Sequence, residues 1–572
     1  MGLCSYCRQR AYVPDARCGK SDCDAKEVGI ISSNRHDVIV VGAGVAGLTS
    51  AAYLCKEGHR VLVVEKEHQS GGLLGSFTID GHIVDRGARG IIDSGIFTPM
   101  AKQLGLAIDQ LPNPVRIAVG EHSVDFRDKT SIDEYGRLLA KLYPGHAPEI
   151  DRIIAEIKRV MGYMDVLYGI ENPLFVPKPY DKEYLLRTLL PWTMRFMLNV
   201  GRAMKLLDPI NDHLRKITAN ESLINIITQH FFAGTPAFFA LSYFSLYLDY
   251  LYPRGSTQTI VDQLVRIVTE HGGHIANGQE VVSIDADKGM VATGEGHEYT
   301  YDQLLWAADL NMMYRCLNPS AWPDSPLKTK VLRQQEFLRT KKGADSVLSL
   351  HLIVKQPPEK FGEISGPHVF FTPSPQGLAG ISLSDLMNEN GSFTSDGERI
   401  LKWLDAFIRQ NTLEISIPSL RDASLSPPGE CALIVSFLMD YQLTRHIADL
   451  GIYEAFKKRI AALVMESLDG YYPQFSKHVS RTVMTTPLTI AARTNNTEGS
   501  LTGWSFTNKP FPAEYRFLKV SKSVLTPVDN IKQAGQWTFN PAGVPVSILT
   551  GKLAADAVAK DLKKNGTKGE KR

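Results

Sequence analysis

The chain has 572 residues and a formal net charge of +2. This length exceeds one simple hydrophobic core and predicts two or more lobes. Hydrophobic residues make up 44% of the chain, as in ordinary globular proteins. The net charge is too small to indicate that the protein binds nucleic acid. The polar N-terminus lacks the apolar segment of a secretory signal. We therefore expect a cytoplasmic protein in a reducing compartment, either free or at a membrane surface.

Four of the seven cysteines fall within the first 23 residues: Cys4, Cys7, Cys18 and Cys23. Two close pairs of thiolates suit tetrahedral Zn²⁺, and an iron–sulfur cluster also takes four thiolates. An arm whose cysteines bind no metal is the third interpretation. Residues 1–34 are accordingly treated as an N-terminal arm with a possible zinc site.

The residues that follow have the pattern of a dinucleotide-binding unit. An apolar, β-branched run at residues 38–41 predicts a buried parallel strand. Gly42, Gly44 and Gly47 follow it with the G-x-G-x-x-G spacing. The first glycine permits a tight turn, the second leaves room for a pyrophosphate, and the third lets the next helix pack closely.

A helix is predicted over residues 48–56 and a second strand over 61–64, and Glu65 stands at the end of that strand. A carboxylate there can accept hydrogen bonds from a ribose hydroxyl, while the helix N-terminus holds the phosphates. The unit predicts a dinucleotide but does not decide between FAD and NAD.

A second glycine-rich loop begins at Gly71 and Gly72. A hairpin turning at Asp80-Gly81 follows it, and residues 85–88, with the sequence DRGA, return the chain towards the nucleotide. These motifs resemble those of the flavin amine oxidase and phytoene desaturase superfamily. Many members carry arginine after the glycine pair, where this chain has Leu73.

The far end of the chain supports this resemblance. Gly535 is followed by a Pro-Gly-rich turn that contains Gly543, and then by a predicted helix. In the superfamily, the N-terminus of this closing helix faces the flavin ring, where it stabilises the negative charge of reduced flavin. Two glycine turns from opposite ends of the chain are therefore expected to bind the same FAD molecule.

The motifs and the resemblance together assign twenty residues to the cofactor: Gly42, Ala43, Gly44, Val45, Ala46, Gly47, Glu65, Lys66, Gly72, Leu73, Leu74, Gly87, Ala88, Arg89, Val281, Gly535, Gln536, Gly543, Val544 and Pro545. The resemblance implies that backbone atoms at Val281 meet the adenine. It also places Arg89 and Gln536 near the flavin ring, and these two are the candidates for a catalytic role. No general base is assigned, because the chemistry is expected to reside in flavin N5.

The expected fold is α/β, with a discontinuous Rossmann-like FAD-binding domain and an α+β substrate domain that has a mixed sheet and a helical cap. The predicted FAD-binding pieces are residues 35–110, 251–310 and 505–562, the substrate pieces are 111–250 and 311–504, and 563–572 form a basic, disordered tail. Residues 111–250 are predicted to be mostly helical.

Two segments of the substrate domain suggest an apolar ligand. Residues 223–248 carry no Asp, Glu, Lys or Arg and are rich in aromatic residues, but Gly234-Thr235-Pro236 interrupts them. We expect the wall of a buried pocket, or plain core, in preference to a membrane span. Residues 181–207 interleave basic with apolar side chains, which is typical of a helix at a membrane interface or of a soluble cap helix with a basic face.

Residues 487–504 resemble a segment of the carotenoid isomerase and retinol saturase branch. The resemblance implies an FAD-dependent desaturase, isomerase or saturase that acts on an apolar small molecule, a long polyene or isoprenoid such as a carotenoid. One alternative is an amine oxidase or a fatty-acid double-bond isomerase. Another is a non-catalytic flavoprotein whose cysteine arm docks a partner. The oligomeric state is not predicted.

Overall fold

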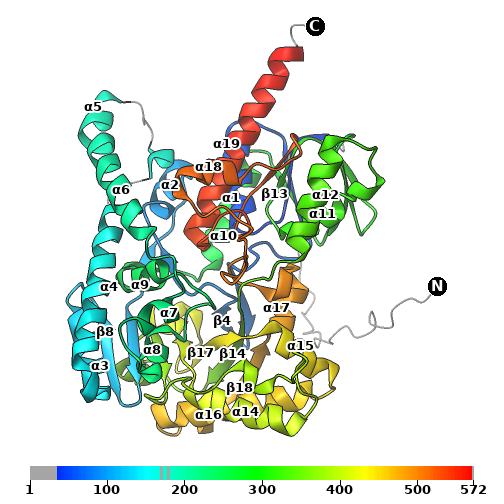
Figure 1. Cartoon of the computed structure of the whole chain (residues 1–572). Helices are drawn as coiled ribbons and strands as arrows, with labels where there is room; N and C mark the ends of the chain where they lie inside the picture. Colours follow the sequence, from blue (N-terminus) through cyan, green and yellow to red (C-terminus); the bar gives the residue numbers. More distant parts are fainter. Residues whose placement is uncertain (1–34, 168–169, 171, 177–180, 570–572) are drawn as a thin grey trace. The chain divides into compact units, whose positions relative to one another are not determined.

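The computed structural model describes residues 35–167, 170, 172–176 and 181–569, and most of their strands form two seven-stranded sheets (Figure 1). The first sheet has the order β10-β2-β1-β13-β12-β11, and β19 also pairs with β13. Its strands are β1 (Arg35–Val41), β2 (Val61–Glu65), β10 (His274–Asn277), β11 (Val281–Asp285), β12 (Met290–Thr293), β13 (Glu298–Trp306) and β19 (Ile531–Gln533). Strands β10, β2, β1, β13 and β19 run parallel, which confirms the predicted Rossmann-like arrangement.

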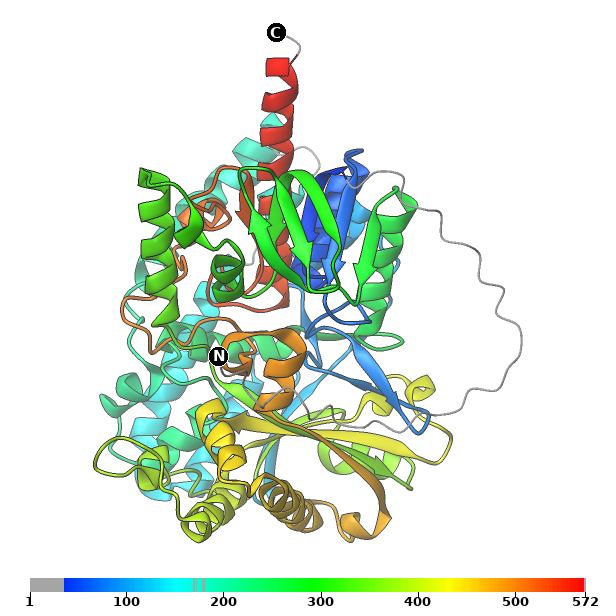
Figure 2. The ribbon, with the colours of Figure 1, turned by 90° about the vertical axis from the view of Figure 1, so that its right-hand side faces the viewer.

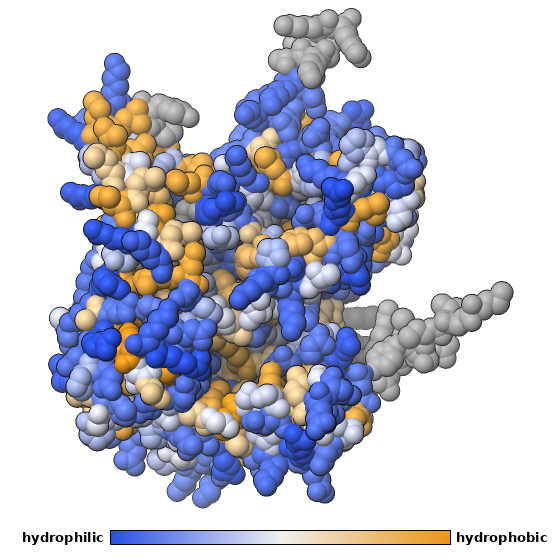
Figure 3. All heavy atoms as spheres, viewed as in Figure 1, coloured by the Kyte–Doolittle hydropathy of each residue, from blue (hydrophilic) through white to orange (hydrophobic). Residues whose placement is uncertain are grey.

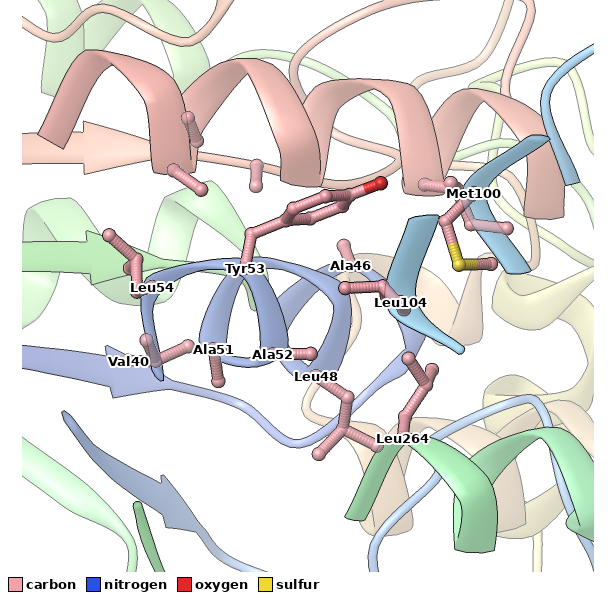
Figure 4. Close-up of a cluster of buried hydrophobic side chains, with 14 of the residues drawn as sticks. Val40, Ala46, Leu48, Ala51, Ala52, Tyr53, Leu54, Met100, Leu104 and Leu264 are labelled. Atoms are coloured by element: carbon pink, nitrogen blue, oxygen red, sulfur yellow. The ribbon is translucent and has the colours of Figure 1, made fainter. Parts of the chain in front are cut away.

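Three helices pack on one face of this sheet: α1 (Val45–Lys56), α10 (Gln258–Glu270) and α19 (Val544–Gly569). Their apolar side chains form one buried cluster with α2 (Phe97–Leu104), and Figure 4 shows α1 between α19 and α10. The α1 side chains are small along this contact, with Ala51 and Ala52 fully buried. Small residues let the helix axes approach closely, so α1 is held on both sides.

Helices α11 (Leu310–Cys316) and α12 (Pro326–Arg339) also pack against the first sheet. Met313, Tyr314 and Val331 are buried in the same cluster as Val41 and Trp306 of the sheet. The predicted domain boundary at residue 310 would place both helices in the substrate domain. The structure extends the first layer to residue 339, because the helix that follows β13 packs back onto the sheet.

The second sheet has the order β18-β14-β17-β16-β15-β7-β8. Its strands are β7 (Val115–Val119), β8 (His122–Phe126), β14 (Ser346–Val354), β15 (His368–Thr372), β16 (Leu413–Ser416), β17 (Cys431–Met439) and β18 (Val479–Thr485). Only β15 and β7 pair in parallel; the other pairs are antiparallel, so the predicted mixed sheet is confirmed.

Two helical groups cover the second sheet. Near β14 to β17 lie α14 (Gly397–Gln410), α15 (Tyr441–Asp449) and α16 (Tyr453–Tyr471) (Figure 2). Near β7 and β8 lie α3 (Ser131–Leu142), α4 (Ala147–Leu167), α7 (Ile210–Arg215), α8 (Glu221–Thr228) and α9 (Ala237–Leu246). The shorter elements are β3 (Ser76–Ile79), β4 (His82–Asp85), β5 (Ile91–Ile92), β6 (Gln110–Pro112), β9 (Tyr250–Pro253), α5 (Lys182–Tyr184), α6 (Leu190–Ala203), α13 (Glu359–Ser365), α17 (Pro487–Thr494) and α18 (Val520–Ser523).

The prediction that residues 111–250 are mostly helical is confirmed, but strands occupy the start of this segment. Strands β6, β7 and β8 occupy residues 110–126, and the last two join the second sheet. The local pattern is that of a hairpin, since Val115, Ile117 and Val119 alternate with smaller or charged residues and are buried. Gly120, with φ of +56°, makes the tight turn.

The predicted C-terminal tail is also corrected. Helix α19 continues to Gly569, so residues 563–569 are helical rather than disordered. Lys563 lies 3.6 Å from Glu57 of the neighbouring α1 end, and Lys564 lies 3.7 Å from Asp561 one turn earlier. Both are surface ion pairs that contribute little stability. The helix is held mainly by the packing of its earlier residues, such as Ile548 and Leu553, in the core.

Among the described helices, none combines the length and the apolar composition that crossing a bilayer needs. The uncharged segment 223–248 instead forms α8, a turn and α9. Phe244 and Tyr247 are buried in the core beside α4. The choice of an interior segment over a membrane span is therefore confirmed.

Candidate functional site

The first glycine loop lies at the carboxyl end of β1. Gly42 has φ of +99°, and a Cβ on Gly47 would lie 2.0 Å from the Gly42 carbonyl oxygen, so only glycine fits both positions. A Cβ on Gly44 would meet nothing within 4 Å, and Gly44 lines a cavity of about 680 Å³. The loop is therefore tightly packed at Gly42 and Gly47 and open towards the cavity at Gly44. This arrangement fits a pyrophosphate at the N-terminus of α1.

Glu65 fixes the shape of this loop. One carboxylate oxygen accepts a 2.7 Å hydrogen bond from the Ala43 backbone N–H, and the other accepts a 2.9 Å bond from that of Glu67. Burial raises the pKa of Glu65, and the two backbone N–H groups partly oppose that rise. The carboxylate also lines the cavity, so its remaining lone pairs can receive a ribose hydroxyl.

The second glycine loop packs against the first. The Gly71 backbone N–H donates to the Ala43 carbonyl oxygen at 2.8 Å, and a Cβ on Gly72 would lie 3.4 Å from the Gly44 Cα. The returning chain closes over this loop, since a Cβ on Gly87 would lie only 2.6 Å from the Leu73 carbonyl oxygen. The two loops and the DRGA turn therefore form one continuous wall.

The C-terminal turn reaches the same cavity. Gly535, Gly543 and the first turn of α19 line it, and a Cβ on Gly535 would lie 3.4 Å from that of Ala46. Further along, the Ser50 hydroxyl of α1 donates to the Gly551 carbonyl oxygen of α19 at 2.8 Å. The two glycine turns converge on one space, although nearly the whole chain separates them in sequence.

Seventeen of the twenty predicted cofactor residues line this cavity: Gly42, Gly44, Val45, Ala46, Glu65, Lys66, Gly72, Leu73, Leu74, Gly87, Ala88, Val281, Gly535, Gln536, Gly543, Val544 and Pro545. Ala43 and Gly47 support the loop from behind. The role of each residue towards FAD stays a prediction.

The expectation for Arg89 is corrected. Its guanidinium does not line the cavity but enters the second sheet, where Nη1 donates to Glu414 at 2.9 Å and Nη2 to the Ser349 and Ser436 hydroxyls. His368 bonds the other Glu414 oxygen at 2.9 Å. Burial alone would raise the pKa of Glu414, but Arg89 and His368 outweigh it and lower that pKa to about 2. Arg89 is therefore a structural cation that ties the DRGA loop to the substrate sheet.

Two other arginines bring positive charge to the glycine loops, where Leu73 replaces the arginine found in many members of the superfamily. Arg86 and Arg493 both line the cavity beside the glycine loops. Arg86 donates to the Gln69 side-chain oxygen, but its buried Nε has no partner among the described residues. Arg493 lies 3.6 Å from Glu67. Burial and the nearby Arg493 charge lower the pKa of Arg86, so an anion between the two cations would relieve their repulsion.

The opposite part of the cavity is aromatic and apolar. Helix α9 contributes Phe238, Phe239 and Tyr243, and α6 contributes Trp192 and Phe196. The indole N–H of Trp192 donates to the Val166 carbonyl oxygen at 2.7 Å, which fixes α6 against the end of α4. The aromatic segment is thus pocket wall on one face of α9 and core on the other.

The metal prediction falls on residues that the structure does not describe, because Cys4, Cys7, Cys18 and Cys23 all precede residue 35. Within residues 35–167, 170, 172–176 and 181–569, no group of three or more His, Cys, Asp or Glu side chains gathers as metal ligands would. The zinc arm stays a prediction.

Comparison with known proteins agrees with these observations. The family model described as flavin containing amine oxidoreductase matches residues 45–559. All-trans-retinol 13,14-reductase of Danio rerio is 23% identical over 533 residues, which cover 87% of this chain and 82% of the relative. Phytoene desaturase of Fusarium fujikuroi is 22% identical over 572 residues, which cover 93% and 90%.

A solved structure, cyclohexylamine oxidase from Brevibacterium oxydans IH-35A, aligns with a TM-score of 0.55 at 12% identity and covers 92% of this chain and 99% of that one. The alignment confirms the predicted fold. The resemblance drawn from the glycine motifs is confirmed by the family model and the relatives.

The first prediction separates two glycines of one motif. Gly44→Ala should leave the stability of the apoprotein unchanged to within about 0.5 kcal/mol, because its Cβ enters open space, yet weaken FAD binding at least about tenfold. Gly47→Ala should destabilise the apoprotein by about 2–3 kcal/mol, because its Cβ collides with the loop. Urea denaturation and FAD titration measure the two effects, and equal behaviour of the variants would contradict the assignment.

The second prediction concerns the two arginines. Arg86→Gln and Arg493→Gln should each raise the Kd for FAD by about ten- to a hundredfold, the worth of a charge-assisted hydrogen bond. Binding of riboflavin, which has no phosphate, should not change. Arg481→Gln is the matched control, because Arg481 pairs with Asp80 at 2.6 Å and does not line the cavity. An equal loss of riboflavin affinity would assign the arginines a structural role.

The third prediction tests the ion pair between the buried Arg89 and the partly buried Glu414. Glu414→Gln should lower the free energy of unfolding by about 3 kcal/mol, because it leaves the Arg89 guanidinium buried without a counter-charge. Folded protein should still bind FAD normally. The contribution of the Glu414 charge is present above its usual pKa of 4.5 and is lost as the pH falls towards 2, so the variant and the parent should converge in acid.

The exposed pair of Arg409 and Glu466 supplies the control for this experiment. Glu466→Gln should cost less than about 1 kcal/mol. A loss of FAD affinity in Glu414→Gln, without a loss of stability, would return Arg89 to the cofactor site.

Proposed function

The chain belongs to the flavin-containing amine oxidoreductase family, and we propose that it is an FAD-dependent oxidoreductase that acts on a long apolar polyene or another isoprenoid. The observation that carries the proposal is the single cavity. Glycine loops, helix N-termini and cations line one part of it, and aromatic side chains of α6 and α9 line the other. Such a division suits a phosphate-bearing cofactor beside an apolar substrate.

Two further observations support this substrate class. Segment 487–504, which resembles the carotenoid isomerase and retinol saturase branch, lines the cavity through Thr489, Ile490 and Asn495. The relatives reported above are named phytoene desaturase and all-trans-retinol 13,14-reductase, and phytoene and retinol are both isoprenoid compounds.

The protein's own residues bind, orient and exclude water. The first turn of α19 presents its N-terminal end to the cavity, which favours negative charge there. Phe239 and Tyr243 offer flat apolar faces along which conjugated or isoprenoid carbons can lie. When bound, FAD supplies a site at N5 that accepts or donates a hydride.

The fourth prediction is an anaerobic half-reaction. Phytoene should bleach the visible absorbance of the oxidised flavin if the protein desaturates, and all-trans-retinol should restore the absorbance of the reduced flavin if it saturates. Cyclohexylamine should do neither. Bleaching by the amine alone would replace this proposal with an amine oxidase, and a flavin that none of the three compounds perturbs would favour a non-catalytic flavoprotein.

A pair of variants on α9 tests the cavity wall. Ser242 lines the cavity and Ser245 does not. Ser242→Phe should slow the reaction of a long polyene by roughly tenfold or more, since it displaces the chain from its binding position, whereas Ser245→Phe should not. Both variants should keep the flavin spectrum of the parent protein. Equal rates would place the substrate elsewhere.

A further inference from the structure

Exposed apolar side chains gather on one segment of the protein. Thirteen large hydrophobic side chains are exposed in the described part of the chain, and seven of them lie between residues 174 and 207. Figure 3 shows this gathering along α5 and α6. Five belong to the continuous helix formed by α5, a π-helical turn over Leu185–Leu189, and α6: Leu186, Leu190, Met194, Met197 and Leu198.

These five side chains form one stripe. They are spaced three or four residues apart along the helix, with Leu198 directly beside Met197, and such spacing places them on one side. Leu186, Met194 and Leu198 are each about two-thirds exposed, with values of 66%, 66% and 67%. An unbroken apolar stripe of this kind on an otherwise polar surface marks an interaction site. We call it the α6 stripe.

Basic residues flank the α6 stripe. Residues 181–207 contain five Lys or Arg against two Asp or Glu, a net charge of +3. Arg187 pairs with Glu183 at 2.6 Å, but Arg195, Arg202 and Lys205 have no carboxylate partner among the described residues. Free cations beside exposed leucines and methionines match the headgroups and acyl chains of an anionic bilayer.

The charge also argues against a second copy of this chain as the occupant. In a two-fold interface the same patch faces itself, so Arg195 and Arg202 would approach their own counterparts without carboxylates to separate them. A lipid surface supplies both the apolar layer and the negative charge.

The opposite face of the same helix lines the cavity. Trp192 and Phe196 point inward with ring centroids 4.6 Å apart, and Leu174, which is 36% exposed, lines the cavity as well. One helix thickness therefore separates the α6 stripe from the aromatic part of the cavity. A molecule dissolved in acyl chains would meet the cavity wall where the stripe enters the bilayer.

We propose that the α6 stripe docks the protein on anionic membranes, and that the Trp192–Phe196 wall behind it admits an apolar substrate from the acyl layer. The docking step stands without the proposed function; the admission step rests on it. The stripe lies in the interface plane, with the leucine and methionine side chains among the upper acyl chains and Arg195, Arg202 and Lys205 at the headgroups.

The fifth prediction is tested by co-sedimentation of the full-length holoprotein with vesicles, without substrate. Vesicles of phosphatidylcholine with one-quarter phosphatidylglycerol should bind the protein, and pure phosphatidylcholine should bind it at least about tenfold more weakly. Leu190→Ser/Met194→Ser should reduce the partition coefficient at least about tenfold. The control Leu327→Ser/Leu525→Ser, which changes two exposed leucines outside the stripe, should bind as the parent does.

A charge variant keeps the test independent of the apolar change. Arg195→Gln/Arg202→Gln should abolish most of the preference for anionic vesicles and leave the flavin spectrum unchanged. Parent protein that binds neither vesicle, or apolar variants that bind equally well, would overturn the proposal. A concentration-dependent dimer of the parent that Leu190→Ser/Met194→Ser dissociates would assign the stripe to self-association and would also overturn it.

The admission step has its own readout. The rate at which a polyene embedded in anionic vesicles reduces or reoxidises the flavin should fall about tenfold or more in Leu190→Ser/Met194→Ser, while the rate with the same polyene in detergent micelles should not change. Equal loss in both media would overturn admission through the stripe. A polyene that neither reduces nor reoxidises the flavin of parent or variant would count against the proposed function and leave the vesicle binding result as it stands.

Discussion

The contact between α1 and α19 is the constraint on which the site depends. A Cβ on Gly551 would lie 2.6 Å from the Ala46 carbonyl oxygen, and the Ser50 hydroxyl bridges the Ala46 and Gly551 carbonyl oxygens across the same contact. Only a glycine allows this approach, and the approach sets where both helices begin. Their N-termini then open on one cavity. The cofactor site is therefore a consequence of helix packing rather than of either loop alone.

This arrangement concentrates positive potential. Two helix N-termini, Arg86, Arg493 and Lys66 line the same cavity, and each partial or full positive charge there disfavours the others. Glu65 and Glu67 offset part of this charge: two backbone N–H groups bond the Glu65 oxygens, and Glu67 lies 3.2 Å from Lys66 and 3.6 Å from Arg493. An anionic ligand completes the balance. The apoprotein should accordingly gain stability from its cofactor beyond what contact area supplies.

The sequence was most informative where local pattern decides structure. The strand, glycine loop and helix of the first unit and the hairpin at Asp80-Gly81 follow from periodicity and turn chemistry. The sequence did not predict features that depend on the direction of a side chain or on a partner distant in the chain. Arg86 and Arg89 are three residues apart in one loop, and only the position of the second sheet, with Glu414, shows which one faces inward.

Two other features were not predicted for the same reason. The β7–β8 hairpin has a clear local pattern, but its place at the edge of the second sheet depends on β15, whose residues are some 250 positions away. The cation from Arg493 reaches the glycine loops because α17 packs there, and no motif near Leu73 announces it. Local sequence patterns thus predict the cofactor loops, whereas tertiary contacts determine which side chains line the cavity beside these loops.

The two parts of the cavity impose opposite demands, and the helix pairs around them meet these demands separately. Near α1 and α19 the backbone comes close and the side chains are small, so N–H groups and cations are exposed to a ligand. Near α6 and α9 the side chains are large and aromatic, so the backbone is withdrawn and the surface is apolar. A ligand with charge at one end of the cavity and a hydrocarbon at the other satisfies both. Since α6 also turns an apolar face outward, the aromatic part continues the character of the surface behind it, and the same side-chain chemistry that would hold a hydrocarbon inside would favour its arrival from a lipid phase.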